Sequence, residues 1–119
     1  RNKNTNNLFF VGAVSGGIAA PTALVNVISR AMIGNKKLSE AISTARVHHS
    51  GVPDITYYEP HLAEVAKSFL MQRGHQIAAT RTLGFVNAIY CSRGLPVDPE
   101  TCLVKSDPRG NGLATSSGK

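Results

Sequence analysis

Two adjacent glycines, Gly16 and Gly17, separate the first apolar segment of this chain from a segment with helical spacing. A turn of this kind leaves backbone N–H groups without partners, and the positive end of the helix dipole lies behind them. Glycine at both positions lets an anionic oxygen approach the backbone. The pattern therefore favours stabilisation of a negative oxygen, such as the oxyanion of an acyl-transfer transition state.

Other interpretations of the same turn stay open. A Gly-Gly turn between a strand and a helix can serve packing or chain reversal alone. Phosphate binding is a further alternative, although the sequence has no Gly-x-x-x-x-Gly-Lys-Ser/Thr pattern. Ser15 could be a nucleophile, but no Gly-x-Ser-x-Gly elbow surrounds it. We therefore treat Ser15 as a candidate substrate-binding residue and not as the catalyst.

Four polar residues further along the chain are expected to hold the fold together: Arg46, His48, Asp107 and Arg109. An arginine in an irregular segment can satisfy several carbonyls with its five donors, and Asp107 with Arg109 suggests an ion pair. Ligand contacts by Arg46 and His48 remain the alternative. Adjacent residues of an extended segment point opposite ways, so we expect no metal at His48 and His49. No cofactor is predicted.

Two cysteines, Cys91 and Cys102, flank a loop of ten residues that contains one glycine and two prolines. If the flanking segments pair as a hairpin, the cysteines face each other across its neck. A disulfide is the preferred interpretation and would indicate an oxidising compartment. Two buried free thiols are the alternative.

These residues need a sheet and helices to position them. Short apolar or β-branched runs bounded by turn residues predict strands, and apolar residues three or four apart predict helices. The expected strands cover residues 8–14, 55–59, 76–80, 85–91 and 102–105, and the expected helices cover residues 21–33, 38–44 and 60–73. Residues 45–53 are expected to be irregular, and residues 107–119 are expected to be loop or disordered.

The length of 119 residues suits a single domain, residues 1–119, of the α+β class. We expect one layer of helices on one face of a mostly antiparallel sheet. In the strand at 85–91, Phe85, Ala88 and Tyr90 are set against Val86, Ile89 and Cys91, so both faces of the sheet are apolar. Such a sheet needs a second layer, which nothing else in the chain supplies. The isolated chain is therefore expected to self-associate.

Composition excludes some classes of function. The net charge is +6, but the basic residues are scattered and only Lys36 and Lys37 are adjacent, which argues against nucleic-acid binding. No apolar run approaches the roughly 20 residues of a membrane span. The chain begins at Arg1 in a polar run, as we expect of an internal cut or a processed end.

Five separated motifs together resemble the gamma-glutamyltransferase family. They keep the family's order and rough spacing from about Leu8 to Gly112. The motifs are Gly12-Ala13-Val14-Ser15-Gly16-Gly17 with Pro21-Thr22 and Asn26; Glu40-Ala41; Ala45-Arg46-Val47-His48-His49 with Pro53-Asp54 and Glu59; Gly74-His75; and Ser106-Asp107-Pro108-Arg109-Gly110. The sequence departs from the family at Ala45, where proline is usual, and in residues 113–119, which lack a Gly-Tyr-type ending.

The resemblance implies an Ntn-hydrolase fold, a four-layer αββα sandwich made by autocatalytic cleavage of a precursor. It implies that the nucleophile is the amino-terminal Thr of the small subunit, which lies outside this chain. That Thr would take the gamma-glutamyl group of a glutathione-like donor and pass it to water, an amino acid or a peptide. Gly16 and Gly17 match the glycines of the family's oxyanion hole.

The chain then corresponds to the carboxy-terminal part of the small subunit and is expected to be inactive alone. Its partners would be the remainder of the small subunit and the large subunit, at an extracellular, cell-surface or periplasmic location. A catalytically dead homologue that acts as a binding or structural module is the alternative from another class. Cephalosporin acylases and relatives that handle poly-gamma-glutamate share these motifs and also remain open.

Overall fold

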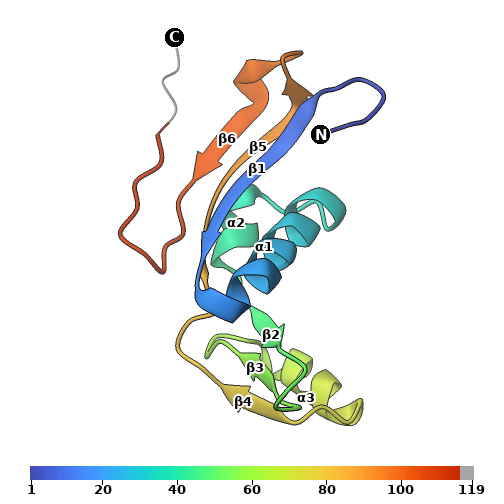
Figure 1. Ribbon diagram of the computed structural model, residues 1–119, viewed down its shortest axis with the longest axis vertical. Coiled ribbons are helices and arrows are strands. Elements are labelled where there is room, and N and C mark those ends of the chain that lie inside the picture. Colours follow the sequence, from blue (N-terminus) through green and yellow to red (C-terminus); the bar gives the residue numbers. More distant parts are fainter. Residues whose placement is uncertain (116–119) are drawn as a thin grey trace.

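The computed structural model describes residues 1–115, which form helices and two three-stranded sheets, and this confirms the α+β class (Figure 1). The strands are β1 (Leu8–Ser15), β2 (Val47–His49), β3 (Thr56–Tyr58), β4 (Ile77–Ala79), β5 (Phe85–Leu95) and β6 (Cys102–Lys105). The α-helices are α1 (Ala20–Ile28), α2 (Leu38–Ser43) and α3 (Glu64–Gln72), and shorter helical turns cover Gly17–Ala19, Ser29–Ile33 and Pro99–Thr101.

The long sheet has the strand order β1-β5-β6 and is antiparallel throughout. In its register Ser15 lies opposite Phe85, at the end of the sheet where β1 leads into α1. The two glycines that follow Ser15 therefore lie beside Gly84, the residue that precedes β5. At the other end of the sheet, Cys91 lies opposite Cys102.

The core lies between the long sheet and the two helices α1 and α2, which cover one of its faces (Figure 1). Its buried residues are Ala23, Val27, Ala31, Leu38, Ala41, Ile42, Val86 and Ala88. The alanines let the helices approach the strands closely. The larger side chains, such as Val27, Leu38 and Ile42, each contribute about 1.5–3 kcal/mol by leaving water.

The opposite face of the long sheet is open. Val11 and Ile89, which lie opposite each other on β1 and β5, are 44% and 38% exposed, and Val104 of β6 lies beside Ile89 on the same face. The predicted sides of β5 were partly wrong: Val86, Ala88 and Tyr90 all face the helices, whereas Phe85 and Ile89 do not. Strict two-residue alternation explains this, because Phe85 and Ala88 are three residues apart and cannot share a face.

The short sheet, with strand order β2-β3-β4, was not predicted as a separate sheet. β2 falls in residues 45–53, which were expected to be irregular. The prediction missed this strand because three residues are too few to show an alternating pattern. β3 pairs antiparallel with β2 but parallel with β4. α3 connects these parallel strands, as a crossover connection requires.

The third helix begins at Glu64 and not at Pro60. The segment after Glu59 forms a turn in which the Leu62 N–H donates to the Glu59 carbonyl at 3.0 Å. Ala63 is then extended, with φ −59° and ψ 141°. Proline suits the start of a turn as well as the start of a helix, so the sequence did not separate the two.

The final described segment, residues 106–115, contains neither helix nor strand, as predicted for residues 107–119; residues 116–119 lie outside the described part of the chain. None of the helices in residues 1–115 is both long enough and apolar enough to cross a bilayer.

Substitution of Ile89 by lysine should reduce self-association of the isolated chain. The change places a charge in the middle of the open face, which otherwise offers a contiguous apolar surface. We expect less binding of a dye that fluoresces on apolar surfaces, and smaller species in sedimentation velocity. Val97→Lys is the control, because Val97 is exposed in the loop after β5. A wild-type chain that is monomeric and binds no dye would contradict the layering.

Candidate functional site

The Gly16–Gly17 turn joins β1 to α1 and needs glycine at both positions. Gly16 has φ 131° and Gly17 has φ 59°, in the region that side chains disfavour. A Cβ on Gly16 would lie 2.5 Å from the Gly84 Cα, so the two backbones are in direct contact. Gly84 also needs its small size, because a Cβ there would lie 3.0 Å from the Ser15 carbonyl oxygen.

The amides of this turn are available to a ligand. Both glycines are exposed, and no hydrogen bond donated by either N–H occurs among the described residues outside the regular strand and helix bonds. A Cβ on Gly17 would meet no atom within 4 Å, so open space lies in front of the turn. The positive ends of the Gly17–Ala19 turn and α1 lie directly behind it. Two N–H donors of this kind suit an oxygen that gains negative charge.

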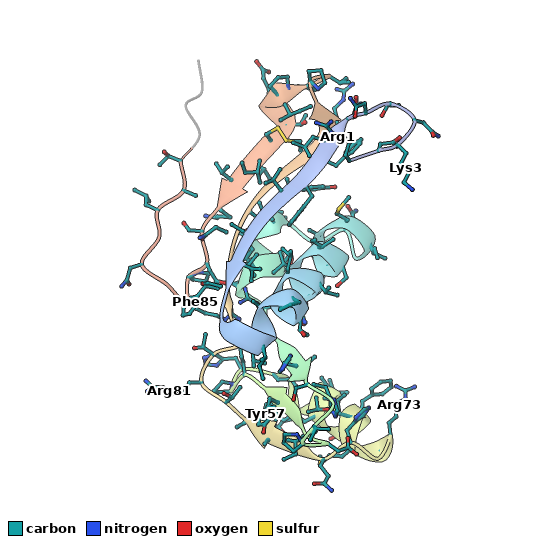
Figure 2. All side chains as sticks on the ribbon, viewed as in Figure 1. Arg1, Lys3, Tyr57, Arg73, Arg81 and Phe85 are labelled. Atoms are coloured by element: carbon teal, nitrogen blue, oxygen red, sulfur yellow. A yellow bond between two sulfur atoms is a disulfide. The ribbon has the colours of Figure 1, made fainter. Side chains whose placement is uncertain are left out.

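Ser15 is the last residue of β1 and is exposed directly before the turn. Phe85, which lies opposite it, marks this end of the long sheet in Figure 2. No hydrogen bond of the Ser15 side chain occurs within residues 1–115. Ser15 is therefore placed beside the Gly-Gly turn, and its role as a substrate contact stays a prediction.

His48 attaches the short sheet to the beginning of α1. Its Nδ1 lies 2.9 Å from the Thr22 Oγ1, and Asn26 Nδ2 donates to the Val47 carbonyl at 3.2 Å. The His48 side chain is buried, and its Nε2 has no partner among the described residues. These contacts fix the orientation of the helix that begins behind the Gly-Gly turn.

Arg46 is fully buried and reaches three segments, two of which are distant in the sequence. Its Nη1 donates to the Gly84 carbonyl at 2.7 Å, and its Nη2 donates to the Ile42 carbonyl at 3.0 Å. The same Nη2 forms an ion pair of 2.6 Å with the Asp107 carboxylate. Because Gly84 is packed against Gly16, Arg46 holds the strand on which the Gly-Gly turn rests.

Arg109 joins the two buried carboxylates. Its Nε donates to Glu59 Oε1 at 2.8 Å, and its Nη1 pairs with Asp107 Oδ1 at 3.1 Å. The Leu83 N–H also donates to Glu59 Oε1, and the Arg46 N–H donates to Oε2. The other oxygen of Asp107, Oδ2, accepts the Val86 N–H. We call Arg46, Glu59, Asp107 and Arg109 the buried ion network.

The carboxylates of the network are held in the charged form. Burial alone would raise the pKa of Asp107, but hydrogen bonds from the Val86 N–H and the Arg46 guanidinium outweigh it and lower the pKa below its ordinary value. Burial would also raise the pKa of Glu59. Hydrogen bonds from Arg109 and the Leu83 N–H outweigh this effect and lower that pKa below its ordinary value. Both groups stabilise the fold only while they are ionised.

Residues 1–115 contain no group of three or more His, Cys, Asp or Glu side chains that could hold a metal ion. His48 and His49, adjacent in β2, use different partners: His48 contacts Thr22, and His49 Nε2 lies 3.0 Å from Asp54 Oδ1.

The site includes two residues to which the sequence analysis gave no role. Glu59 was quoted only as part of a motif, and its aromatic and proline neighbours gave no sign that it is an acceptor for two arginines. Gly84 was passed over inside the segment before β5. A lone glycine at the start of a strand does signal close backbone approach, and that signal could have identified it.

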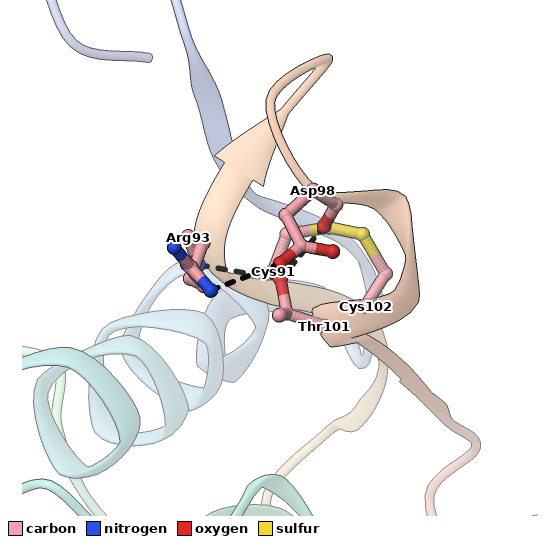
Figure 3. Close-up of a disulfide and its surroundings, with 5 residues drawn as sticks. All are labelled: Cys91, Arg93, Asp98, Thr101 and Cys102. Atoms are coloured by element: carbon pink, nitrogen blue, oxygen red, sulfur yellow. Dashed lines mark hydrogen bonds and ion pairs between the residues drawn. A yellow bond between two sulfur atoms is a disulfide. The ribbon is translucent and has the colours of Figure 1, made fainter.

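Cys91 and Cys102 form a disulfide that connects β5 to β6 (Figure 3). The loop that it closes carries an ion pair of 3.3 Å between Arg93 and Asp98. The Thr101 Oγ1 donates to the Asp98 carbonyl at 2.8 Å. The disulfide lies at the end of the long sheet away from the Gly-Gly turn.

One family of proteins matches this chain over nearly its whole length. The model described as Gamma-glutamyltranspeptidase matches residues 2–117. This chain belongs to the gamma-glutamyltranspeptidase family. The resemblance drawn from the five motifs is thereby confirmed.

Individual gamma-glutamyltranspeptidases extend this result. Glutathione hydrolase 3 of Arabidopsis thaliana is 32% identical over 79 residues, which cover 57% of this chain and 12% of the plant protein. A solved Helicobacter pylori gamma-glutamyltranspeptidase mutant is 32% identical with a TM-score of 0.77, over 92% of this chain and 58% of that chain. The Pseudomonas nitroreducens gamma-glutamyltranspeptidase complexed with L-DON has a TM-score of 0.79 at 24% identity, over 98% of this chain and 60% of that chain.

These likenesses confirm the Ntn-hydrolase fold of gamma-glutamyltranspeptidases. The chain spans 58–60% of the length of these solved chains and 12% of the plant protein.

Asp107→Asn should destabilise the fold by about 3–5 kcal/mol, because it leaves the buried Arg46 guanidinium without its counter-charge. Asp98→Asn is the matched control: it breaks the surface pair with Arg93 and should cost no more than about 1 kcal/mol. Urea unfolding at neutral pH measures both. Small and equal losses in the free energy of unfolding for the two variants would show that the buried ion network contributes little to stability.

Acid should unfold the protein through the same carboxylates. The folded pKa values of Glu59 and Asp107 lie below the unfolded ones, so their stabilisation is complete above about pH 4–5 and is lost as the pH falls through the folded values. The free energy of unfolding of Asp107→Asn should fall less steeply with acid than that of the wild type. Parallel pH profiles would contradict this assignment.

Loss of the disulfide should lower stability by about 2–3 kcal/mol, as the loop-entropy model gives for a closed loop of this size. Urea unfolding of the oxidised and reduced chain measures the difference. A Cys91→Ser, Cys102→Ser double variant should match the reduced wild type and ignore reductant. Alkylation that adds the same mass to the wild type with and without prior reduction would mean that no disulfide had formed.

Proposed function

We propose that this chain is the carboxy-terminal part of a gamma-glutamyltransferase or glutathione hydrolase small subunit, in which it supplies the oxyanion hole. The observation that carries the proposal is the Gly16–Gly17 turn, which is exposed, has open space beside Gly17 and lies at the positive end of a helix. Membership of the family and 32% identity with a plant glutathione hydrolase support it.

In the proposed reaction, an amino-terminal Thr outside this chain attacks the gamma-carbonyl carbon of a glutathione-like donor. The carbonyl oxygen gains negative charge as the tetrahedral intermediate forms. The N–H groups of Gly16 and Gly17 donate hydrogen bonds to that oxygen and lower the barrier. Collapse of the intermediate expels the amine and leaves the gamma-glutamyl group on the Thr, from which water, an amino acid or a peptide accepts it.

The division of the site between polypeptides makes the isolated chain inactive. We propose that the remainder of the small subunit covers the open face of the long sheet, where Val11 and Ile89 are exposed. That arrangement supplies the second sheet of the αββα sandwich and brings the Thr to the amides. The apolar character of both faces of the sheet supports this layering.

We propose an extracellular, cell-surface or periplasmic location for the assembled protein. The disulfide between Cys91 and Cys102 supports it, because disulfides persist in oxidising compartments.

Gly17→Ala in the assembled enzyme should lower kcat for hydrolysis of a gamma-glutamyl anilide. The new methyl group would occupy the open space in front of the turn and displace the oxyanion from the amides. We expect the loss to approach the roughly 10²–10³-fold that follows removal of one oxyanion donor, with a smaller change in KM.

Gly74→Ala is the matched control for this experiment. Gly74 also has a positive φ, 85°, and a Cβ there would meet nothing within 4 Å, so both substitutions impose a similar backbone cost. Gly74 follows α3 and lies outside the turn. Equal kcat values for the two variants would contradict the proposed role of Gly17.

A further inference from the structure

A second apolar surface lies apart from the open sheet face. The helix α3 borders a groove of about 360 Å³ that also contacts β2 and the Ser29–Ile33 turn after α1, and its lining residues are Arg30, Val47, Leu62, Val65, Ala66, Phe69 and Leu70. We call it the α1–α3 groove. No residue of α3 is buried, and Val65 and Phe69 are 78% and 53% exposed. An amphipathic helix gains little from folding when its apolar face stays in water, which marks this surface as an interface.

The sandwich architecture does not account for this groove. None of its lining residues belongs to the long sheet, whose open face is the one that a second sheet would cover. Figure 1 shows α3 beside the short sheet, away from the long sheet and beyond the helices that cover it. A partner of the open face would therefore leave it uncovered.

Arg30 gives the groove its electrostatic character. Its guanidinium is half-buried and donates to the carbonyls of Thr44, at 3.1 Å, and Ala45, at 2.6 Å, and to the Asn26 side chain. It contacts no carboxylate within the described residues. Burial lowers the pKa of Arg30, and repulsion from Arg46 and Arg109 lowers it further. A charged group in this position is stabilised by a carboxylate supplied from outside.

The remaining charges around the groove are also positive in balance. Arg73, at the end of α3, lies 3.6 Å above the Phe69 ring, and Figure 2 shows it at the outer end of that helix. Glu64, the acidic residue of α3, is paired with Lys67 at 2.6 Å. Arg30 and Arg73 are thus left to attract an acidic partner, in a chain with a net charge of +6.

We propose that the α1–α3 groove binds an acidic amphipathic helix of a polypeptide segment outside this chain, with a carboxylate paired to Arg30. An apolar groove along one helix accepts the apolar face of another amphipathic helix. The positive rim selects segments that carry carboxylates beside their apolar residues. This docking does not depend on the oxyanion role of the Gly-Gly turn.

Photo-crosslinking in the full-length parent protein identifies the occupant. p-Benzoylphenylalanine in place of Phe69 should crosslink to one segment outside these 119 residues, and mass spectrometry should find Asp or Glu within about one helical turn of the crosslinked residue. The same photo-reactive group in place of Val97 is the control and should yield no protein crosslink. A crosslink to a second copy of this chain, a crosslink to a segment without carboxylates, or none above the control would overturn the proposal.

A pair of opposite charges tests the selection for acid. Phe69→Glu and Phe69→Lys remove the same apolar ring, but glutamate repels an acidic partner and lysine attracts it. A glutamate at position 69 would lie near Arg73 and could pair with it, so we expect Phe69→Glu to leave the fold at least as stable as Phe69→Lys does. Weaker binding by Phe69→Glu would then reflect repulsion of the partner. With the crosslinked segment as a synthetic peptide, Kd should rise at least about tenfold more for Phe69→Glu than for Phe69→Lys. Equal or reversed effects would overturn the proposal, even if the assembled protein has full gamma-glutamyl transfer activity.

Discussion

The ion pair between Arg46 and Asp107 is the interaction on which the rest of this structure depends. Both side chains are removed from water, and the loss of hydration of two charges costs several kcal/mol per ion. The cost is offset only if nearly every donor and acceptor finds a partner in the right place. Arg46 meets this condition at both terminal nitrogens, but not at its Nε, with carbonyls from Ile42 of α2 and from Gly84 directly before β5. The positions of these segments are therefore fixed relative to one another.

The buried ion network fixes the position of the Gly-Gly turn. Arg46 holds the Gly84 carbonyl, and Gly84 is in contact with Gly16 through backbone atoms alone. No flexible side chain lies between the buried charges and the turn. Amides that stabilise a transition state must be in place before charge develops, because reorganisation during the reaction would cost energy. A rigid connection from a buried ion pair to the turn meets that need.

The chain leaves two apolar surfaces exposed to solvent. The long sheet is apolar on both faces but covered on one, and α3 displays its apolar residues to solvent. The buried ion network stabilises the junction of the segments without any second layer. The Gly-Gly turn is therefore held in place even though one sheet face and the apolar side of α3 are exposed.

The sequence predicted the elements with a clear period and the residues with a chemical signature. The strand 8–14 and the helix that begins near Pro21 follow from their apolar spacing, and the Gly-Gly turn from its position between them. The strand β2 was missed because three residues carry no period. The role of Glu59 was missed because its partners, Arg46 and Arg109, lie 13 and 50 residues away. Contacts of that range depend on the folded topology, which local patterns do not encode.

The central claim is that the amides of Gly16 and Gly17 bind the oxyanion of the acyl-transfer step. A crystal structure of the assembled enzyme, trapped as a covalent tetrahedral adduct on its nucleophile, measures this directly. The account predicts that the adduct oxygen lies about 2.7–3.1 Å from both amide nitrogens. An adduct oxygen held by other groups, beyond hydrogen-bonding distance of both glycines, would contradict it.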